Sequence, residues 1–404
     1  MTAQTWLLYA TFFIFSLFSS KVRAQEKTNA AEIPKPSSGV HVSTQNNDRF
    51  SLKLGARIQS RYVFTTQAGE SAHKFQIRRA RLKLKGHVFG KNNRFYIQLG
   101  LSPEDMTGGL LSETGSPRRV PLRDARIEFH QLAWAQIWIG QMKVPFSHER
   151  IVSDAYLNLV DRSLHNQEFN MDRDLGVQVR SDHLGGFFSY ALGAFSGQGR
   201  NIYDETKPAL TLVGRLQFRL VGHADLATQG DLQRSPRPGA SLGIAYSLQS
   251  AAPGDQGVHG HRPADGGTTS MEQATSDLVF KWRGLALEAA ASLRLGRRRV
   301  DNSPRLTQIE AVRNGWGYLV QLGYLLQRTR LELVARYSQL KPLYLGGLPS
   351  ALDPASEVNG GINYYLGGHD LKIEFDLSHR WERRPLQSDT LKINALRLQF
   401  QLAI

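Results

Sequence analysis

The sequence predicts an all-β protein, a transmembrane antiparallel up-and-down β-barrel of about sixteen strands. The first observation is the run FQIRRARLKLKG at Phe75–Gly86, in which basic residues alternate with aliphatic ones. Because successive side chains of a strand point to opposite faces, one face of this strand is cationic and the other is apolar. The second observation is that the alternation recurs up to Ile404, while too little other apolar sequence remains to fill the core of a soluble sandwich. We therefore expect a closed barrel with an apolar outside and a cationic inside.

Alternating segments follow one another along the chain. In the first, Leu52 and Leu54 lie on the face opposite Lys53 and Arg57. An even strand number allows both termini of a bacterial barrel to lie on the periplasmic side. In chain order, the predicted strands are Leu52–Phe64, Phe75–Gly86, Phe95–Leu101, Arg123–His130, Ala133–Gln141, Asp174–Arg180, Phe188–Phe195, Leu210–Leu220, Ala240–Leu248, Asp277–Trp282, Leu285–Gly296, Trp316–Leu326, Arg330–Tyr337, Val358–Tyr365, Leu371–Trp381 and Leu391–Ile404.

The connections between these strands alternate in length. Transmembrane barrels carry short turns on one rim and long loops on the other. One connection departs from this rule, because Val221–Gly239 is long although strand parity puts it on the short-turn side. The predicted short turns are Lys91–Asn93, His183–Gly186, Arg283–Gly284, Gln327–Thr329 and Gly367–Gly368, and the predicted long connections are Pro103–Leu122, Val144–Arg173, Gln249–Gln273, Arg297–Asn314 and Pro342–Ala355.

The carboxyl end continues the apolar stripe to the terminus. Leu398, Phe400, Leu402 and Ile404 share one face of the last segment. A soluble domain seldom ends on such an exposed apolar edge. The segment resembles the closing strand of outer-membrane barrels, which the barrel assembly machinery reads. Since Ile404 replaces a terminal Phe, we expect that recognition to rest on Phe400 and Leu402.

Residues 1–24 are predicted to be a secretory signal peptide. Trp6–Phe18 is apolar except for Thr11 and Ser16, and small residues up to Ala24 resemble a cleavage site. A membrane helix is the alternative, but it needs about 20 apolar residues. Residues 25–48 have no periodic pattern, so we expect a flexible N-terminal leader there and the barrel over residues 49–404.

The composition indicates anionic partners. The chain has no cysteine and a formal net charge of +15, so neither a disulfide framework nor a thiolate metal site is available. A strongly basic chain attracts nucleic acid, anionic lipid headgroups or small anions. Nucleic acid is disfavoured because aliphatic residues, and not stacking aromatics, separate the arginines. We expect outer-membrane lipids and small anions such as phosphate as partners.

The sequence carries no strong enzyme signature. It lacks GxSxG, HExxH and a phosphate-binding glycine loop, and its twelve histidines are dispersed. No catalytic residue, metal ligand or cofactor is therefore predicted. A lipase-like Ser/His/acid cluster at one rim of the barrel stays open as an alternative.

The face opposite the aliphatic residues is predicted to line the pore. Rings of Arg and Lys in a water-filled bore favour anions. The alternative for each arginine is an ion pair across the lumen that stiffens the wall. Arg79, Arg81, Lys83 and Lys85 have no acid in their own strand, so we expect them to generate a positive field. The predicted pore-lining residues are Arg57, Arg61, Arg79, Arg81, Lys83, Lys85, Arg126, Arg180, Arg215, Arg219, Arg294, Arg298, Arg336 and Arg397.

The third long connection, Lys143–Asp174, is predicted to narrow this pore. In sixteen-stranded porins the loop at this position commonly folds into the bore. The alternative is a loop packed over the external mouth. The predicted constriction residues are Lys143, His148, Glu149, Arg150, Asp161 and Arg162.

Several motifs resemble the phosphate-selective porin O and P family. They are IRRARLKLKG at Ile77–Gly86, IGQMKVPFSHER at Ile139–Arg150, DRS at Asp161–Ser163, RDLGVQV at Arg173–Val179 and FSYALGAFSGQG at Phe188–Gly199. The resemblance is densest over Ser51–Gly199. It implies a homotrimeric, sixteen-stranded outer-membrane channel with an arginine ladder for phosphate or polyphosphate, and adds Arg78, beside Arg79, to the pore-lining residues. Strict alternation lets only one of these two face the lumen, so a local bulge would be needed for both.

We therefore expect a passive porin for small anions in the bacterial outer membrane, reached by signal-peptide-directed export. A general or sugar-permeable porin is the first alternative, and a barrel enzyme is the second. A soluble secreted protein that binds polyanions is the third.

Overall fold

The computed structural model describes residues 40–43, 49–106, 120–184, 186–202, 209–263, 265–299, 310–344, 350–384 and 389–404. The predicted signal peptide and most of the predicted leader lie outside these residues. The strands are β1 (Val40–Ser43), β2 (Phe50–Gln67), β3 (Glu70–Val88), β4 (Asn93–Gly100), β5 (Leu122–Phe129), β6 (Gln136–Lys143), β7 (Arg173–Leu184), β8 (Phe188–Phe195), β9 (Leu210–Val221), β10 (Gly239–Ala252), β11 (Thr268–Trp282), β12 (Leu285–Arg299), β13 (Gly315–Leu325), β14 (Leu331–Pro342), β15 (Ala355–Gly367), β16 (Leu371–Arg384) and β17 (Asp389–Ala403).

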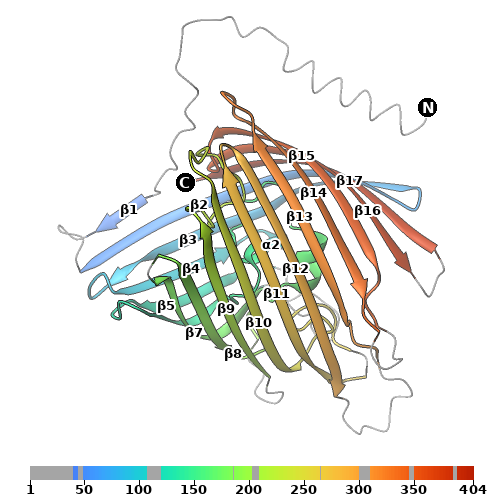
Figure 1. Cartoon of the computed structure of the whole chain (residues 1–404), viewed down its shortest axis with the longest axis horizontal. Coiled ribbons are helices and arrows are strands. Elements are labelled where there is room, and N and C mark those ends of the chain that lie inside the picture. Colours follow the sequence, from blue (N-terminus) through green and yellow to red (C-terminus); the bar gives the residue numbers. More distant parts are fainter. Residues whose placement is uncertain are drawn as a thin grey trace, which may run out of the picture. The chain divides into compact units, whose positions relative to one another are not determined.

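Strands β2–β17 form a closed antiparallel barrel of sixteen strands (Figure 1). Each strand pairs with the next along the chain, and β17 returns to pair with β2 from Ile393↔Gln67 to Ala403↔Arg57. Closure satisfies the backbone groups of every barrel strand, which is what a strand surrounded by lipid requires. The predicted fold class is confirmed.

The described residues include three short helices, all in connections from the end of the barrel that carries the long loops. They are α2 (Pro103–Met106), α3 (His148–Ile151) and α4 (Leu164–Phe169). Among the described residues, no helix has the length and apolar character needed to cross a membrane.

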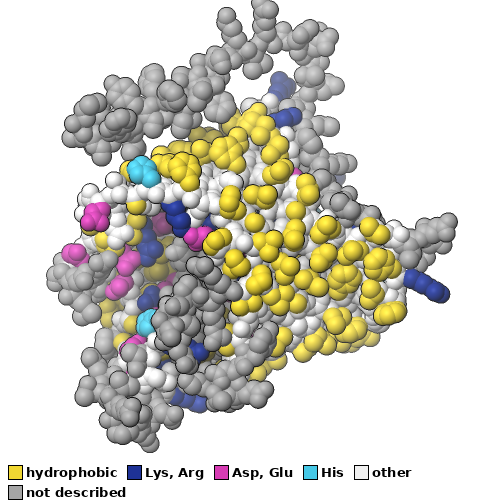
Figure 2. Space-filling view, turned by 180° about the vertical axis from the view of Figure 1, so that it is seen from behind, with side chains coloured by type: hydrophobic (Ala, Val, Ile, Leu, Met, Phe, Trp, Pro, Cys, Tyr) yellow, Lys and Arg dark blue, Asp and Glu magenta, His cyan; other side chains and the backbone are white. Residues whose placement is uncertain are grey.

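The outer wall is apolar, as the alternation predicts. Figure 2 shows a broad hydrophobic surface over one side of the barrel, with charged side chains gathered at its open end. The same alternation turns the polar partners inward, where most are buried. Exposed aliphatic and aromatic side chains on the strands include Ile127, Ile139, Val177, Leu192, Leu216, Ile244, Val320, Leu333, Ile362 and Phe400.

Each predicted strand overlaps an observed one, but several boundaries differ. The largest difference is β11, which begins at Thr268 although the apolar stripe suggested Asp277. Glu272 and Ser276 occupy outward positions in the added part and are exposed. The ladder with β10 and β12 continues there, so the strand extends beyond the apolar stripe that a sequence pattern detects.

The predicted turn at Arg283–Gly284 has positive φ at both residues, +51° and +91°. This backbone matches the twist of a tight hairpin. A similarly tight turn at Ala68 and Gly69 joins β2 to β3, so this connection is short on the rim that otherwise carries the long loops.

Strand β1 lies within the segment expected to be a flexible leader. It pairs with β2 from Val40↔Leu54 to Ser43↔Ser51. Strand β17 pairs with β2 only as far as Arg57, so β1 continues the line of β17 and covers an edge that would otherwise be unpaired.

Candidate functional site

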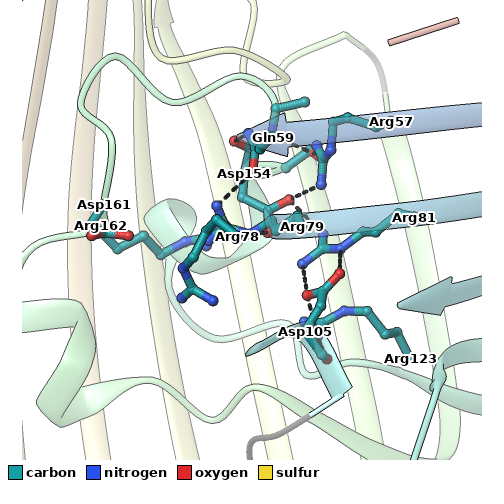
Figure 3. A network of polar contacts seen from close by, with 12 residues as sticks. Arg57, Gln59, Arg78, Arg79, Arg81, Asp105, Arg123, Asp154, Asp161 and Arg162 are labelled. Atoms are coloured by element: carbon teal, nitrogen blue, oxygen red, sulfur yellow. Dashed lines mark hydrogen bonds and ion pairs between the residues drawn. The ribbon is translucent and has the colours of Figure 1, made fainter. Parts of the chain in front are cut away.

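Loop L3, residues 144–172 between β6 and β7, lies inside the lumen, and one carboxylate fixes it to the wall. Asp154 accepts from Arg57 at 2.6 Å, from Arg79 at 2.8 Å and from Arg81 at 2.7 Å (Figure 3). The arginines share the inward faces of β2 and β3. Burial opposes ionisation of Asp154, but the guanidinium groups of Arg81, Arg57 and Arg79 hold its pKa well below the usual range.

Helix α2 brings a second carboxylate to the same wall. Asp105 accepts from Nε of Arg81 at 2.5 Å and from Nη2 of Arg81 at 2.6 Å. Arg123 of β5 lies 2.9 Å from the same carboxylate. Carboxylates from two different loops therefore neutralise Arg81 (Figure 3).

The far part of L3 contacts β2 again and the neighbouring strands β17 and β16. Asp161 lies 2.9 Å from Arg61 of β2 and 3.4 Å from Arg397 of β17. Lys372 of β16 donates to the carbonyl of Leu157 at 2.8 Å. Asn158 of L3 also donates to Glu332 of β14 at 3.0 Å, and His148 contacts Glu288 of β12 at 2.7 Å, so L3 reaches across the lumen and is bonded to several strands.

L3 also has internal hydrogen bonds that keep it folded. Glu149 accepts from the backbone N–H of Ser163 at 2.7 Å and from its hydroxyl at 2.6 Å. The Ser163 hydroxyl in turn accepts from the backbone N–H of Asn166 at 3.0 Å, which caps α4. Arg294 of β12 and Arg313 both pair with Glu168 of α4.

The connection between β9 and β10, residues 222–238, turns into the lumen from the short-turn end. The backbone N–H of Gln229 donates to Tyr156 of L3 at 3.0 Å, and the N–H of Asn158 donates to the Gln229 side chain at 3.0 Å. Lys281 of β11 donates to the carbonyls of Thr228 and Gly230 at 2.7 and 2.9 Å. The long exception in the connection pattern is therefore a second element inside the barrel.

The space left open lies on the other side of the lumen. A cavity of about 420 Å³ is lined by side chains of β3–β9, by L3 and by Leu226 of the connection. Its lining contains two carboxylates, Asp124 and Asp154, and nine cationic side chains. The nine are Arg81, Lys83, Arg126, Lys143, Arg150, Arg162, Arg173, Arg180 and Arg215.

Three of these cations have no carboxylate within ion-pair distance among the described residues: Lys83, Lys143 and Arg162. Lys143 donates to the carbonyls of Ile151 and Val152 at 2.8 and 3.2 Å. Arg162 donates to backbone carbonyls of L3 at 2.9 and 2.7 Å. Carbonyl contacts orient Lys143 and Arg162 without bringing an acid beside them, so among the described residues no ion pair offsets the cationic side chains in this part of the lining.

An aromatic ring orders two further cations on this wall. The guanidinium of Arg126 lies 4.2 Å from the ring centroid of Trp138, and that of Arg180 lies 4.4 Å from it. Each also pairs with an acid two positions along its own strand, Glu128 for Arg126 and Asp182 for Arg180. Stacking fixes the plane of a guanidinium and leaves its edge available to an oxyanion.

The comparisons with known proteins agree with this geometry. Residues 52–219 match the family of phosphate-selective porins O and P. The resemblance drawn from the sequence motifs is confirmed. The family match over this part of the chain and the barrel fold indicate a location in the bacterial outer membrane. No curated protein matches the chain in sequence.

Solved structures share the fold at low sequence identity. An anion-selective porin from Comamonas acidovorans is 11% identical with a TM-score of 0.59, covering 88% of this chain and 100% of the other. The outer-membrane channel DcaP of Acinetobacter baumannii is 13% identical with a TM-score of 0.58, covering 91% and 100%. OmpF of Salmonella typhi, in complex with daunomycin, is 14% identical with a TM-score of 0.54, covering 90% and 100%.

The residues expected to line the pore divide into two groups in the structure. Arg81, Lys83, Arg126, Arg180 and Arg215 line the open cavity, and Arg219 lines a smaller one nearer the short-turn end. Lys85 is exposed and lines neither cavity. The second group donates hydrogen bonds to, or forms ion pairs with, loop residues. Its members are Arg57, Arg61, Arg79, Arg294, Arg298, Arg336 and Arg397.

The paired arginines Arg78 and Arg79 are accommodated by a bulge. The register of β2 and β3 shifts between Gln59↔Arg79 and Ser60↔Ile77, which leaves Arg78 as the extra residue. Figure 3 shows both side chains in the network around Asp154. A bulge re-aims a side chain that strict alternation would turn outward.

The residues expected in the constriction also divide. Lys143, His148, Arg150 and Arg162 line the cavity. Glu149 and Asp161 instead hold L3 in place, through Ser163 and Arg61 respectively. Trp138 and the 222–238 connection were missed as lumen elements, although the length of that connection was a visible signal.

Replacing Asp154 by Ala is expected to release L3 from the wall. It leaves three buried guanidinium groups facing one another, and breaking a buried ion pair in this way costs about 3–5 kcal/mol. We expect a larger single-channel conductance in a planar bilayer and a lower free energy of unfolding in urea.

The matched control is Glu272→Ala, which removes an exposed carboxylate on the outside of β11. It is expected to leave conductance unchanged. An Asp154→Ala channel with wild-type conductance would show that this carboxylate does not position L3.

Proposed function

We propose that this porin allows passive diffusion of small anions through the cavity on the β3–β9 side. The observation that carries the proposal is the cavity lining, with nine cationic side chains against two carboxylates. A unit charge ~4 Å from a fixed cation gains about 4 kcal/mol at an effective dielectric of ~20, so the surplus is large enough to select ions.

Phosphate or polyphosphate fits the residues that lack acidic partners. Lys83, Lys143 and Arg162 line the cavity with no acid within ion-pair distance among the described residues, and a guanidinium binds phosphate through two parallel hydrogen bonds. The family match, and an anion-selective porin among the similar structures, support this choice of solute class. The contacts must stay weak enough for release, because conduction requires it.

We propose further that residues 1–24 direct export and that β17 addresses the barrel assembly machinery. The chain is proposed to act as a homotrimer in outer-membrane lipid and to carry out no catalysis. The porin fold and family support a channel over an enzyme.

The proposal predicts that Lys83→Glu lowers anion selectivity. The substitution replaces an unpaired cation in the cavity by an anion, so we expect the chloride-to-potassium permeability ratio to fall by roughly tenfold, or about 1.4 kcal/mol. Reversal potentials in a KCl gradient measure this ratio.

Lys85→Glu is the matched control, because Lys85 shares the face of β3 with Lys83 but does not line the cavity. Its effect should be much smaller. Equal effects of the two variants, or cation selectivity of the wild type, would contradict the proposal.

Phosphate is expected to reduce chloride current through the wild type, because it occupies the cavity longer than chloride does. Lys83→Gln removes one cation, so half-block should then need a higher phosphate concentration. The measurement is chloride conductance as phosphate is titrated at constant ionic strength. Equal block in both channels would show that phosphate does not bind at Lys83.

A further inference from the structure

Two cavities in the lumen share part of their lining. A second cavity, of about 220 Å³, lies between the periplasmic ends of β8–β10 and the first residues of the 222–238 connection. Three residues line both this cavity and the larger one: Ser189 of β8, Gln217 of β9 and Leu226 of the connection. We infer that a solute moving from one cavity to the other passes between these three residues, and we call this place the neck.

The neck has two chemically different sides. The barrel wall offers the Ser189 hydroxyl and the Gln217 amide, whereas the connection offers the aliphatic side chain of Leu226. Arg215 lines the larger cavity and Arg219 lines the smaller one. Arg215 is paired with the Asp277 carboxylate at 2.7 Å, so an anion at the neck has Arg219 on the smaller-cavity side and hydrogen-bond donors on only one wall.

The connection is held in place by its backbone. The Asp231 carboxylate accepts from the N–H groups of Gly284 at 2.7 Å and Ser235 at 2.9 Å. The N–H of Arg283 donates to the Ser235 carbonyl at 2.9 Å. These bonds tie the connection to the β11–β12 turn, in addition to the three oxygens that receive Lys281. These hydrogen bonds fix the connection inside the lumen.

Loop L3 positions Leu226 at the neck. His148 of L3 contacts the Leu226 carbonyl through Nε2 at 3.1 Å and the Glu288 carboxylate through Nδ1 at 2.7 Å. Both ring nitrogens therefore face acceptors. The backbone of Leu226 depends on a side chain from the loop that enters the barrel from the opposite end.

We propose that the 222–238 connection is a second selectivity element of the pore, in which Leu226, opposite Ser189 and Gln217, limits the size of the anions that pass between lumen and periplasm. The inference rests on the proposed anion channel. It assigns to a periplasmic connection, and not to L3 alone, the control of which anions pass.

Leu226→Cys tests this directly, because the chain contains no natural cysteine. A sulfonate-bearing methanethiosulfonate reagent, added on the periplasmic side of a planar bilayer, forms a disulfide with the new thiolate and releases sulfinate. The added group is bulky and anionic, so anion current should fall by roughly half or more and return on reduction with dithiothreitol.

Gln233→Cys is the matched control. Gln233 is exposed on the same connection and lines neither cavity, so its modification should leave the current unchanged. Mass spectrometry verifies that both thiols react. Unchanged current in fully modified Leu226→Cys would overturn the inference, whereas a wild type without anion current would refute the proposed channel instead.

Leu226→Gly and Leu226→Trp give a second measurement that does not depend on modification. The glycine variant should raise gluconate permeability relative to chloride, and the tryptophan variant should lower it. Identical ratios in both variants would mean that the neck does not limit size.

The same contact predicts a pH dependence. Burial lowers the pKa of His148, but Glu288 of β12 and Asp277 of β11 outweigh burial and Arg215 of β9, so the pKa is raised above its ordinary value. Protonated His148 stabilises this contact fully at pH values below the ordinary pKa of histidine. The stabilisation is lost as pH rises through the raised pKa of His148. A neutral imidazole donates once, so the Leu226 carbonyl loses its partner and conductance should increase with pH.

His148→Gln distinguishes titration from packing, because its amide donates hydrogen bonds at every pH. Conductance recorded over pH 5–9 should show the rise in the wild type and a flat profile in His148→Gln. A rise of the same size in both channels would assign the titration to another group.

Discussion

The interaction between Asp154 and three strand-borne arginines determines the form of the lumen. Period-two alternation places Arg57, Arg79 and Arg81 on inward faces, and burying unpaired guanidinium groups is costly. Asp154 of loop L3 supplies the missing negative charge, so ion pairs with the wall hold the loop inside the barrel. Where a loop carboxylate reaches the wall, space is filled and charge is cancelled. Where none reaches it, as at Lys83, both the space and the potential remain. One electrostatic constraint therefore sets both the path and its selectivity.

This constraint makes the pore asymmetric. L3 and the 222–238 connection contact β11, β12, β14, β16 and β17, whereas the open cavity lies along β3–β9. Inward-facing arginines on the filled side, such as Arg294 and Arg336, bond to L3. Facing the lumen and lining the pore are thus different properties, because a loop that occupies half the lumen converts wall cations there into structural contacts.

The sequence predicted the barrel well because lipid imposes a periodic pattern on each strand, and it predicted the loop rim from connection lengths. It could not give strand ends such as Thr268, where the hydrogen-bonded ladder continues after the apolar stripe stops. Nor could it pair Arg81 with Asp105 and Asp154, because both carboxylates lie in connections whose path the strand pattern does not determine. The sequence showed only that a bulge at Arg78 would be needed for both arginines to face the lumen. It could not show the bulge itself, because the register depends on how two strands pair. The inward direction of the cations was therefore predictable, but their division into free and paired groups was not.

The 222–238 connection shows why a short-turn rim can still control a pore. A flexible turn would pay conformational entropy to enter the lumen, but this one gains backbone and side-chain partners at several points. Lys281 satisfies two of its carbonyls, Asp231 joins it to Gly284, and Gln229 bonds to L3. The two lumen elements thus stabilise each other from opposite ends, with His148 at their contact. Because the backbone of Leu226 is bonded to L3, displacing either element changes the neck, and the pore behaves as one unit with two constrictions.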